Sequence, residues 1–127
     1  MKHPPLRWEL YLVDFGSGVG SEQRGTRPAL VVSNNGFNQS LPLATVLPLT
    51  KQARKRRPAY RFEVRMAAGS AGNNEDSLLM PHQVRSVSRD RLLRRLGKLE
   101  SPVLRAEIED RLSDHLGFDF EDDPGNA

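Results

Sequence analysis

The chain has 127 residues, no cysteine, and 19 lysines and arginines against 16 aspartates and glutamates. This length suits one domain with a core that needs no disulfide bonds, and the lack of cysteine excludes cysteine-ligated zinc and a thiol nucleophile. No apolar run is long enough to span a membrane, and no signal peptide is evident. We expect a single cytoplasmic domain over residues 1–120 and a disordered acidic tail over residues 121–127.

The charge is distributed unevenly along the chain. Residues 1–99 carry 17 lysines and arginines and 7 acids, a balance of +10, whereas residues 100–127 carry 2 and 9, a balance of −7. A strongly basic body indicates a polyanionic partner, of which nucleic acid is the commonest. The acidic end could be a solvated tail or could shield part of the basic surface.

Short apolar segments predict a mainly β protein. Residues 29–33 are apolar on both faces, which favours a central strand, and Pro48 indicates that the strand over residues 43–49 is an edge strand or carries a bulge. The motif Asn34-Asn35-Gly36 predicts a turn. Alternation or apolar runs predict strands over residues 7–15, 29–33, 43–49, 60–65, 77–80, 83–87 and 92–99.

One substantial helix is expected near the C-terminus. Ser101 has the side chain of an N-cap, proline follows it at the first helical position, and Gly117 can cap the C-terminal end. A shorter helical turn is expected after Ser88. The apolar stripe of the helix comprises Val103, Leu104, Ile108, Leu112 and Leu116. These elements predict a compact, strongly bent β-sheet or small barrel of six to seven strands with a helix packed on it.

The polar loop before the second strand holds the first candidate site residue. Arg27 lies where this glycine-containing loop meets the sheet, and Pro28 stiffens the backbone beside it. The loop also carries side chains able to hydrogen-bond a ligand, among them Ser21, Glu22 and Gln23. The same composition would equally suit a solvated hairpin loop.

Four segments resemble the MazF/PemK family of toxin endoribonucleases. The first is Gly20-Ser21-Glu22-Gln23-x-Gly25-x-Arg27-Pro28 after an apolar strand, and it is long and ordered. The second is Pro48-Leu49-Thr50-Lys51-Gln52. Shorter matches follow in Asp76-Ser77-Leu78-Leu79 and Gln83-Val84-Arg85-Ser86-Val87. The resemblance covers residues 7–120.

This resemblance implies a compact, SH3-like small barrel with a C-terminal helix. It also implies a homodimeric toxin that cleaves single-stranded RNA at short sequences without a metal or other cofactor and is neutralised by a cognate antitoxin. It implies that Arg27 and Thr50 are catalytic. It further implies RNA-contacting roles for Ser21, Glu22, Gln23, Gln52, Ser77 and Gln83.

The chemistry of RNA cleavage suits this set of residues. The 2′-OH is a built-in nucleophile, so the enzyme must align it, stabilise negative charge on the phosphate and move protons. Arg27 can bind phosphate oxygens bidentately, and Thr50 can donate a hydrogen bond to a non-bridging oxygen. Glu22 could accept the 2′-OH proton or hold Arg27 in place.

His82 is a departure from the family pattern, because relatives often carry an acid just before the glutamine at position 83. An imidazole could replace that acid as a base, stack on an RNA base or have no function. Residues 51–57 form a basic segment in which Lys51 and Arg54 could follow the phosphate backbone, or the segment could be a solvated loop. Trp8 is expected in the core.

Two alternative functions share this fold or this charge. A CcdB-like gyrase poison inhibits by binding and has no need of the Arg27 and Thr50 pair. A general RNA-binding module with a degenerate site would bind RNA without cutting it. In the leading interpretation, the antitoxin is expected to be an acidic or partly disordered segment over the basic groove.

Overall fold

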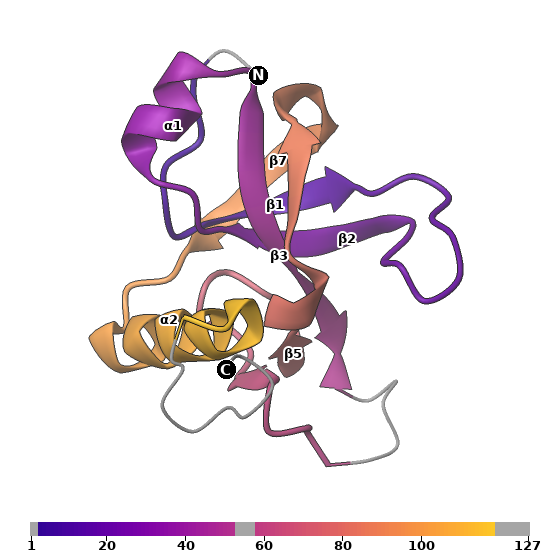
Figure 1. Ribbon diagram of the computed structural model, residues 1–127, viewed down its shortest axis with the longest axis vertical. Coiled ribbons are helices and arrows are strands. Elements are labelled where there is room, and N and C mark those ends of the chain that lie inside the picture. The colour runs from indigo at the N-terminus through magenta and orange to yellow at the C-terminus, as the bar shows by residue number, and fades with distance from the viewer. Residues whose placement is uncertain (1–2, 53–57, 119–127) are drawn as a thin grey trace.

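The structure is a computed structural model that describes residues 3–52 and 58–118, and its strands are joined in one antiparallel sheet (Figure 1). Their order is β4-β5-β3-β2-β1-β7, and β6 also pairs with β3. The strands are β1 (Glu9–Asp14), β2 (Thr26–Val31), β3 (Leu43–Lys51), β4 (Val64–Met66), β5 (Ser77–Leu79), β6 (Arg85–Ser88) and β7 (Leu92–Lys98). The helices are α1 (Asn35–Ser40) and α2 (Pro102–Leu116), with 3₁₀ turns η2 (Pro81–Gln83) and η3 (Arg89–Arg91).

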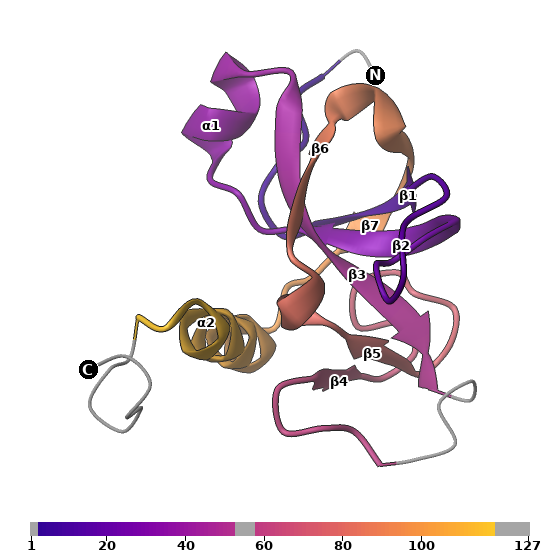
Figure 2. The same cartoon turned by 45° about the vertical axis from the view of Figure 1, so that its right-hand side comes forward.

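The long strand β3 connects two parts of the sheet (Figures 1 and 2). Its first part pairs with β2 and β6, and its last three residues pair with β5. Among the described residues β4 and β7 form no ladder with each other, so the sheet is strongly bent but open. This architecture confirms the predicted mainly β fold with a C-terminal helix.

Pro48 was predicted to mark an edge strand or a bulge. β3 is instead central, and its ladder with β2 has no register shift at Pro48. The ladder with β6 ends at Val46 and the ladder with β5 begins at Leu49, so Pro48 lies in the gap between them. No partner on that side requires an N–H from this residue. The Pro48 carbonyl still accepts a hydrogen bond from Met80 N at 3.0 Å.

Local hydrogen bonds show that several predicted boundaries of strands and turns are wrong. Asn34 is the N-cap of α1, with its side chain accepting from Phe37 N at 2.8 Å, where a simple turn was expected. Residues 60–63 form a turn in which Glu63 N donates to the carbonyl of Tyr60 at 3.0 Å, so β4 begins only at Val64. The predicted pair of strands over residues 77–80 and 83–87 is interrupted by η2.

The two faces of β2 enter two core clusters, which confirms its predicted central position. Leu30 packs in the cluster that also contains Trp8 and Ile108, whereas Ala29 and Val31 pack in the cluster around Phe15. A strand buried on both faces has to be apolar on both, because each face meets a separate core.

Helix α2 begins and ends as the sequence predicts, but only the middle of its apolar stripe is buried. Ser101 accepts from Leu104 N at 3.2 Å, and Gly117 caps the helix in the left-handed conformation with φ 75°. Ile108 is fully buried, but Val103 is 77% and Leu116 is 48% exposed. The described residues contain no helix that is both long and apolar enough to cross a membrane.

A buried acid joins β1 to β7. The Glu9 carboxylate accepts from Arg95 Nε at 2.6 Å, from Tyr11 Oη at 3.1 Å and from Leu6 N at 2.6 Å. Burial, and after it the negative charge of Glu9, raises the pKa of Tyr11 to about 12. A buried carboxylate is tolerated here because several donors satisfy it.

Candidate active site

Arg27 and Thr50 meet at the open end of the β2–β3 pair. The β2–β3 register pairs Ala29 with Pro48, and continuing it by two residues sets Arg27 opposite Thr50. The Arg27 side chain donates through Nη1 to Thr50 Oγ1 at 3.5 Å and through Nε to the carbonyl of Arg24 at 3.0 Å. Thr50 is only 5% exposed. Both residues therefore lie on strands, and the Arg27 side chain is positioned by a loop carbonyl and by Thr50.

These two residues line one hollow of about 330 Å³, which we call the arginine cleft. The residues that line it come from strands β1, β2, β3, β5 and β7 and from the loop between β4 and β5, which we call the loop wall. Its lining residues are Leu12, Thr26, Arg27, Pro28, Leu49, Thr50, Lys51, Gly72, Asn73, Asn74, Glu75, Ser77, Arg94 and Leu96.

The charged residues of the cleft are mostly basic. Arg27, Lys51 and Arg94 face one acid, Glu75. Lys51 Nζ lies 3.4 Å from Glu75 Oε1, and both side chains are 51% exposed. A cleft with this balance of charge attracts an anion, and a half-exposed ion pair can open at little cost.

The loop wall of the cleft is fixed by a close backbone contact with β7. Gly72 has φ 93°, and a Cβ placed there would come within 2.3 Å of the Leu96 carbonyl oxygen. A Cβ on Gly97 would likewise lie 2.3 Å from the Ala71 carbonyl oxygen. Only glycine fits at either position, because any side chain would push the loop away from the strand.

Asn73 and Ser77 hold the rest of this wall in shape. The buried Asn73 amide donates to the carbonyls of Glu75 and Ala67 at 2.9 and 3.2 Å. The Ser77 hydroxyl donates to the Glu75 carbonyl at 2.8 Å. Ser77, a predicted RNA-binding residue, therefore lines the cleft, but its hydroxyl proton is already donated to a carbonyl of the protein.

The loop between β1 and β2 is attached to two separate parts of the molecule. Its Arg24 carbonyl accepts from Arg27, as described above. Its Ser21 carbonyl accepts from Gln83 Nε2 at 3.0 Å, and Gln23 N donates to Gln83 Oε1 at 3.3 Å. Both the Nε2 and the Oε1 atoms of Gln83 therefore bind this loop. Gln83 was predicted to bind RNA.

Glu22 and His82 line a second hollow, which we call the loop hollow. It measures about 370 Å³ and is lined by Glu22, Gln23, His82, Gln83, Val84 and Arg85. Glu22 is exposed, and its carboxylate accepts from Val19 N at 3.2 Å. Neither candidate base is among the residues that line the arginine cleft.

The remaining predicted site residues lie along β3 and beyond it. Gln52 is half-buried, and its backbone N donates to the Asp76 carbonyl at 2.9 Å. Arg54, residues 53–57 in general and the predicted acidic tail over residues 121–127 lie outside the described residues.

Sequence reasoning missed Arg94, Glu75, Asn73 and the glycine pair. A glycine inside an otherwise regular strand indicates a bulge or a close backbone approach, so Gly97 carried a usable signal. Arg94 and Glu75 carried none, because their places in the cleft depend on how β7 and a loop meet β1 and β3.

Comparison with known proteins identifies the family. Residues 6–116 match the model of the PemK-like, MazF-like toxin of type II toxin-antitoxin systems. The chain is 34% identical to endoribonuclease MazF9 of Mycobacterium tuberculosis (strain ATCC 25618 / H37Rv) over 115 residues, covering 87% of this chain and 94% of that protein. It is 32% identical to endoribonuclease EndoA of Bacillus subtilis (strain 168) over 98 residues, covering 77% and 83%.

Solved structures show the same likeness. The crystal structure of MazF from Deinococcus radiodurans has a TM-score of 0.76 and 30% identity, covering 91% of this chain and 99% of that one. An endoribonuclease in complex with its cognate antitoxin, from a mycobacterial species, has a TM-score of 0.70 and 25% identity, covering 89% and 95%. The chain belongs to the family of PemK-like, MazF-like toxins of type II toxin-antitoxin systems.

Proposed function

We propose that this protein is an endoribonuclease toxin that cleaves single-stranded RNA at the arginine cleft without a metal ion. The observation that carries the proposal is the contact of Arg27 Nη1 with Thr50 Oγ1, at 3.5 Å, in a basic cleft. The relatives named above are endoribonucleases, which favours this function over a CcdB-like gyrase poison.

Arg27 and Thr50 divide the work of stabilising the phosphate. The guanidinium donates to the threonine oxygen, so the threonine O–H proton is left to donate to a non-bridging phosphate oxygen. The other donors of Arg27 can bind the same phosphate, where negative charge grows during the reaction. Because Thr50 is β-branched and buried, its hydroxyl is held in place before RNA arrives.

The reaction uses the RNA's own nucleophile. The 2′-oxygen forms a bond to phosphorus, the bond from phosphorus to the 5′-oxygen breaks, and the products are a 2′,3′-cyclic phosphate and a 5′-hydroxyl. A base takes the 2′-OH proton and an acid returns one to the leaving oxygen. Glu22 and His82 are our two candidates for the base, and each requires the RNA strand to run from the arginine cleft to the loop hollow.

The RNA strand would follow the basic and amide groups beside the cleft. Lys51 can bind a phosphate once it leaves Glu75, and Gln52 continues from the end of β3. Arg54, which is outside the described residues, completes the proposed set as a residue that binds the RNA phosphate backbone. Ser21, Gln23, Ser77 and Gln83 would shape the sites in which bases are read, since several of their polar groups already hold the loops.

Neutralisation by a cognate antitoxin and action as a cytoplasmic homodimer complete the proposal. One solved relative is described in complex with its cognate antitoxin. A basic cleft favours an acidic antitoxin segment that competes with RNA. Binding of that antitoxin should weaken as NaCl rises and should block RNA cleavage, and binding that ignores salt and leaves cleavage intact would contradict this part.

The proposal is tested by incubating the purified protein with a long single-stranded RNA in EDTA and mapping the new ends. We expect cuts at a short recurring sequence with 2′,3′-cyclic phosphate termini. Arg27→Ala should lower the cleavage rate about 10³-fold or more, because it removes a fixed donor from the developing charge.

Arg65→Ala is the matched control, because Arg65 is an exposed arginine on β4 and does not line the cleft. Its cleavage rate should stay near that of the unchanged protein. Cleavage retained by Arg27→Ala would remove Arg27 from the mechanism. Intact RNA together with inhibited gyrase would replace the proposed function with the binding alternative, and RNA binding without cleavage would indicate a degenerate site.

A further inference from the structure

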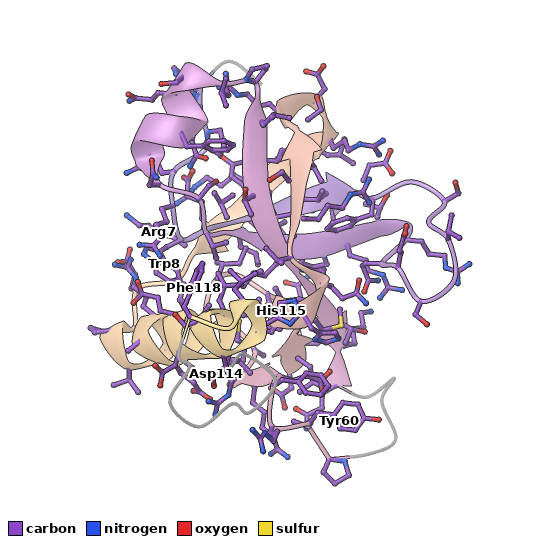
Figure 3. All side chains as sticks on the ribbon, viewed as in Figure 1. Arg7, Trp8, Tyr60, Asp114, His115 and Phe118 are labelled. Atoms are coloured by element: carbon purple, nitrogen blue, oxygen red, sulfur yellow. The ribbon has the colours of Figure 1, made fainter. Side chains whose placement is uncertain are left out.

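A third hollow lies between α2 and the segment before β4, outside the arginine cleft. It measures about 640 Å³, and we call it the helix hollow. The side chains come from three elements: the turn before β4, the 3₁₀ turn η2 and the C-terminal half of α2. Figure 3 shows two of them, Asp114 and His115, on α2. They are Arg61, Phe62, His82, Arg111, Asp114 and His115.

Aromatic rings form one side of this hollow. Phe62 meets His82 edge to face, with ring centroids 4.7 Å apart and an interplanar angle of 75°. Tyr60 packs on Phe62 at 5.1 Å. Tyr60 and Phe62 are 49% and 40% exposed, so the cluster presents ring surface to solvent in place of burying it. Exposed rings beside a hollow are the usual platform for an unstacked base.

Two permanent cations and one acid flank the rings. Arg61 is exposed, and the ion pair of Arg111 with Glu107 is long, at 4.0 Å, so the guanidinium retains donors for another acceptor. Asp114 supplies a carboxylate that can accept from an exocyclic amino group, and His115 lies beside it on α2. This set of groups matches one base and the phosphate next to it.

The helix hollow and the loop hollow are neighbours, because His82 lines both. The loop hollow in turn shares Glu22 and Arg85 with a smaller hollow of about 290 Å³, whose lining also includes Arg91. Each of the three hollows has at least one arginine in its lining. An extended strand that carries phosphates and bases can bind neighbouring basic hollows of this kind.

We propose that the helix hollow binds an unpaired base of the RNA strand at a position outside the cleaved step. The base stacks on Phe62, Arg61 and Arg111 bind the adjoining phosphate, and Asp114 favours bases that carry an amino group. This inference rests on the proposed function. RNA is favoured over a protein segment because an exposed ring lies beside two arginines, which suits a base and its phosphate, and because amide side chains line the neighbouring loop hollow.

The test places 2-aminopurine at successive positions of an RNA that contains the mapped cleavage sequence. A 2′-O-methyl group on the attacking nucleotide prevents cleavage, so binding can be measured on the full protein. We expect quenching of 2-aminopurine fluorescence at one position outside the cleaved step, and loss of this quenching in Phe62→Leu. The affinity ratio of the long RNA to an RNA truncated before that position should fall about tenfold in the variant.

Phe62→Tyr should restore the quenching, because it keeps the ring. Phe118→Leu is the matched control, since Phe118 is 66% exposed and is not a lining residue of the hollow. Arg111→Gln should reduce the slope of log affinity against log salt by about one. Asp114→Asn should reduce the preference between cytosine and uracil at the same position.

Absence of a quenched position, or quenching that persists in Phe62→Leu, would overturn the inference. So would an unchanged RNA affinity together with weaker binding of a synthetic acidic peptide, which would assign the hollow to a protein partner. The fluorescence measurement uses uncleavable RNA and does not depend on catalysis. If no RNA is cut and no cleavage sequence can be mapped, the probe is placed instead in an RNA selected for binding to the full protein. Failure to cut RNA would then count against the proposed function alone.

Discussion

The arginine cleft and the helix hollow are both basic, but the protein builds them in different ways. In the cleft, Arg27 and Thr50 come from neighbouring strands, and Thr50 is buried. In the helix hollow, Phe62 comes from a turn, His82 from a 3₁₀ turn, and most of the lining is exposed or half-buried. Strand backbone fixes a side chain more closely than a turn does, because it is paired by hydrogen bonds along its length.

This difference matches the demands of two kinds of chemistry. Stabilising a transition state requires donors that are already in place, because any rearrangement during the reaction raises the barrier. Stacking on a base tolerates small shifts, since every base has a flat face and the ring can follow it. We therefore expect substitutions in the cleft to change the rate of cleavage and substitutions in the hollow to change affinity.

The largest effect that separates the two regions is expected for Thr50→Val. Valine keeps the shape of threonine and removes only the hydroxyl, so kcat should fall about 10²- to 10³-fold with little change in RNA affinity. Single-turnover cleavage and binding of uncleavable RNA would measure the two quantities separately.

Glu22→Gln is the comparison variant, because Glu22 lies in the loop hollow. We expect a smaller fall in kcat than for Thr50→Val. An equal fall, together with loss of the acidic limb of the pH–rate profile, would assign the proton transfer to Glu22. It would also show that the RNA strand runs from the arginine cleft to the loop hollow during catalysis.

A second prediction concerns the wall of the cleft. Gly97→Ala would place a Cβ 2.3 Å from the Ala71 carbonyl oxygen, so the loop before β5 has to move. We expect the free energy of unfolding to fall by about 1–3 kcal/mol, as for other overpacked sites, with a fall in cleavage rate. Urea unfolding and a cleavage assay on the same sample would measure both.

Gly36→Ala is the control for this substitution. Gly36 lies in α1, has no positive φ, and its added Cβ would meet only Asn34 Oδ1 at 3.3 Å. Its stability should change by less than that of Gly97→Ala. If Gly97→Ala unfolds the protein but leaves the cleavage rate of the folded fraction unchanged, the wall does not position the cleft.

The contrast between the two regions also explains what could be predicted from the sequence. The meeting of Arg27 and Thr50 in one cleft could be anticipated, because each lies in a continuous motif at a strand end. Their catalytic roles come from the family resemblance and stay a prediction. β2 was predictable as a central strand, because an apolar run buried on both faces leaves a plain signal.

The errors come from positions that local pattern does not determine. The alternation of Tyr60 to Arg65 predicted a strand, but Glu63 instead closes a turn by accepting from Tyr60 N at 2.8 Å. The strand containing Pro48 was mispredicted because a central strand can contain a proline where one ladder has ended and the next has not begun. Only the assembled sheet shows this gap. Arg94 and Glu75 enter the cleft only through contacts between distant segments.

The smallest effect is expected for Glu75→Gln, which tests the electrostatics of the cleft and leaves the proposed catalytic residues Arg27 and Thr50 unchanged. Glu75 pairs with Lys51 at 3.4 Å, and an arriving phosphate must compete with its carboxylate for that lysine. Removing one negative charge should tighten binding of uncleavable RNA about three- to fivefold at low salt, because an exposed pair of this kind is worth less than about 1 kcal/mol.

The gain should shrink as NaCl rises, since salt screens exposed charges over about 10 Å at 0.1 M. Glu100→Gln is the matched control, because Glu100 also forms an ion pair, in its case with Arg105 at 3.7 Å, but does not line the cleft. Its RNA affinity should change less at every salt concentration. If Glu75→Gln instead lowers kcat and does not tighten binding, this carboxylate takes part in proton transfer. The general base would then lie in the arginine cleft and not in the loop hollow.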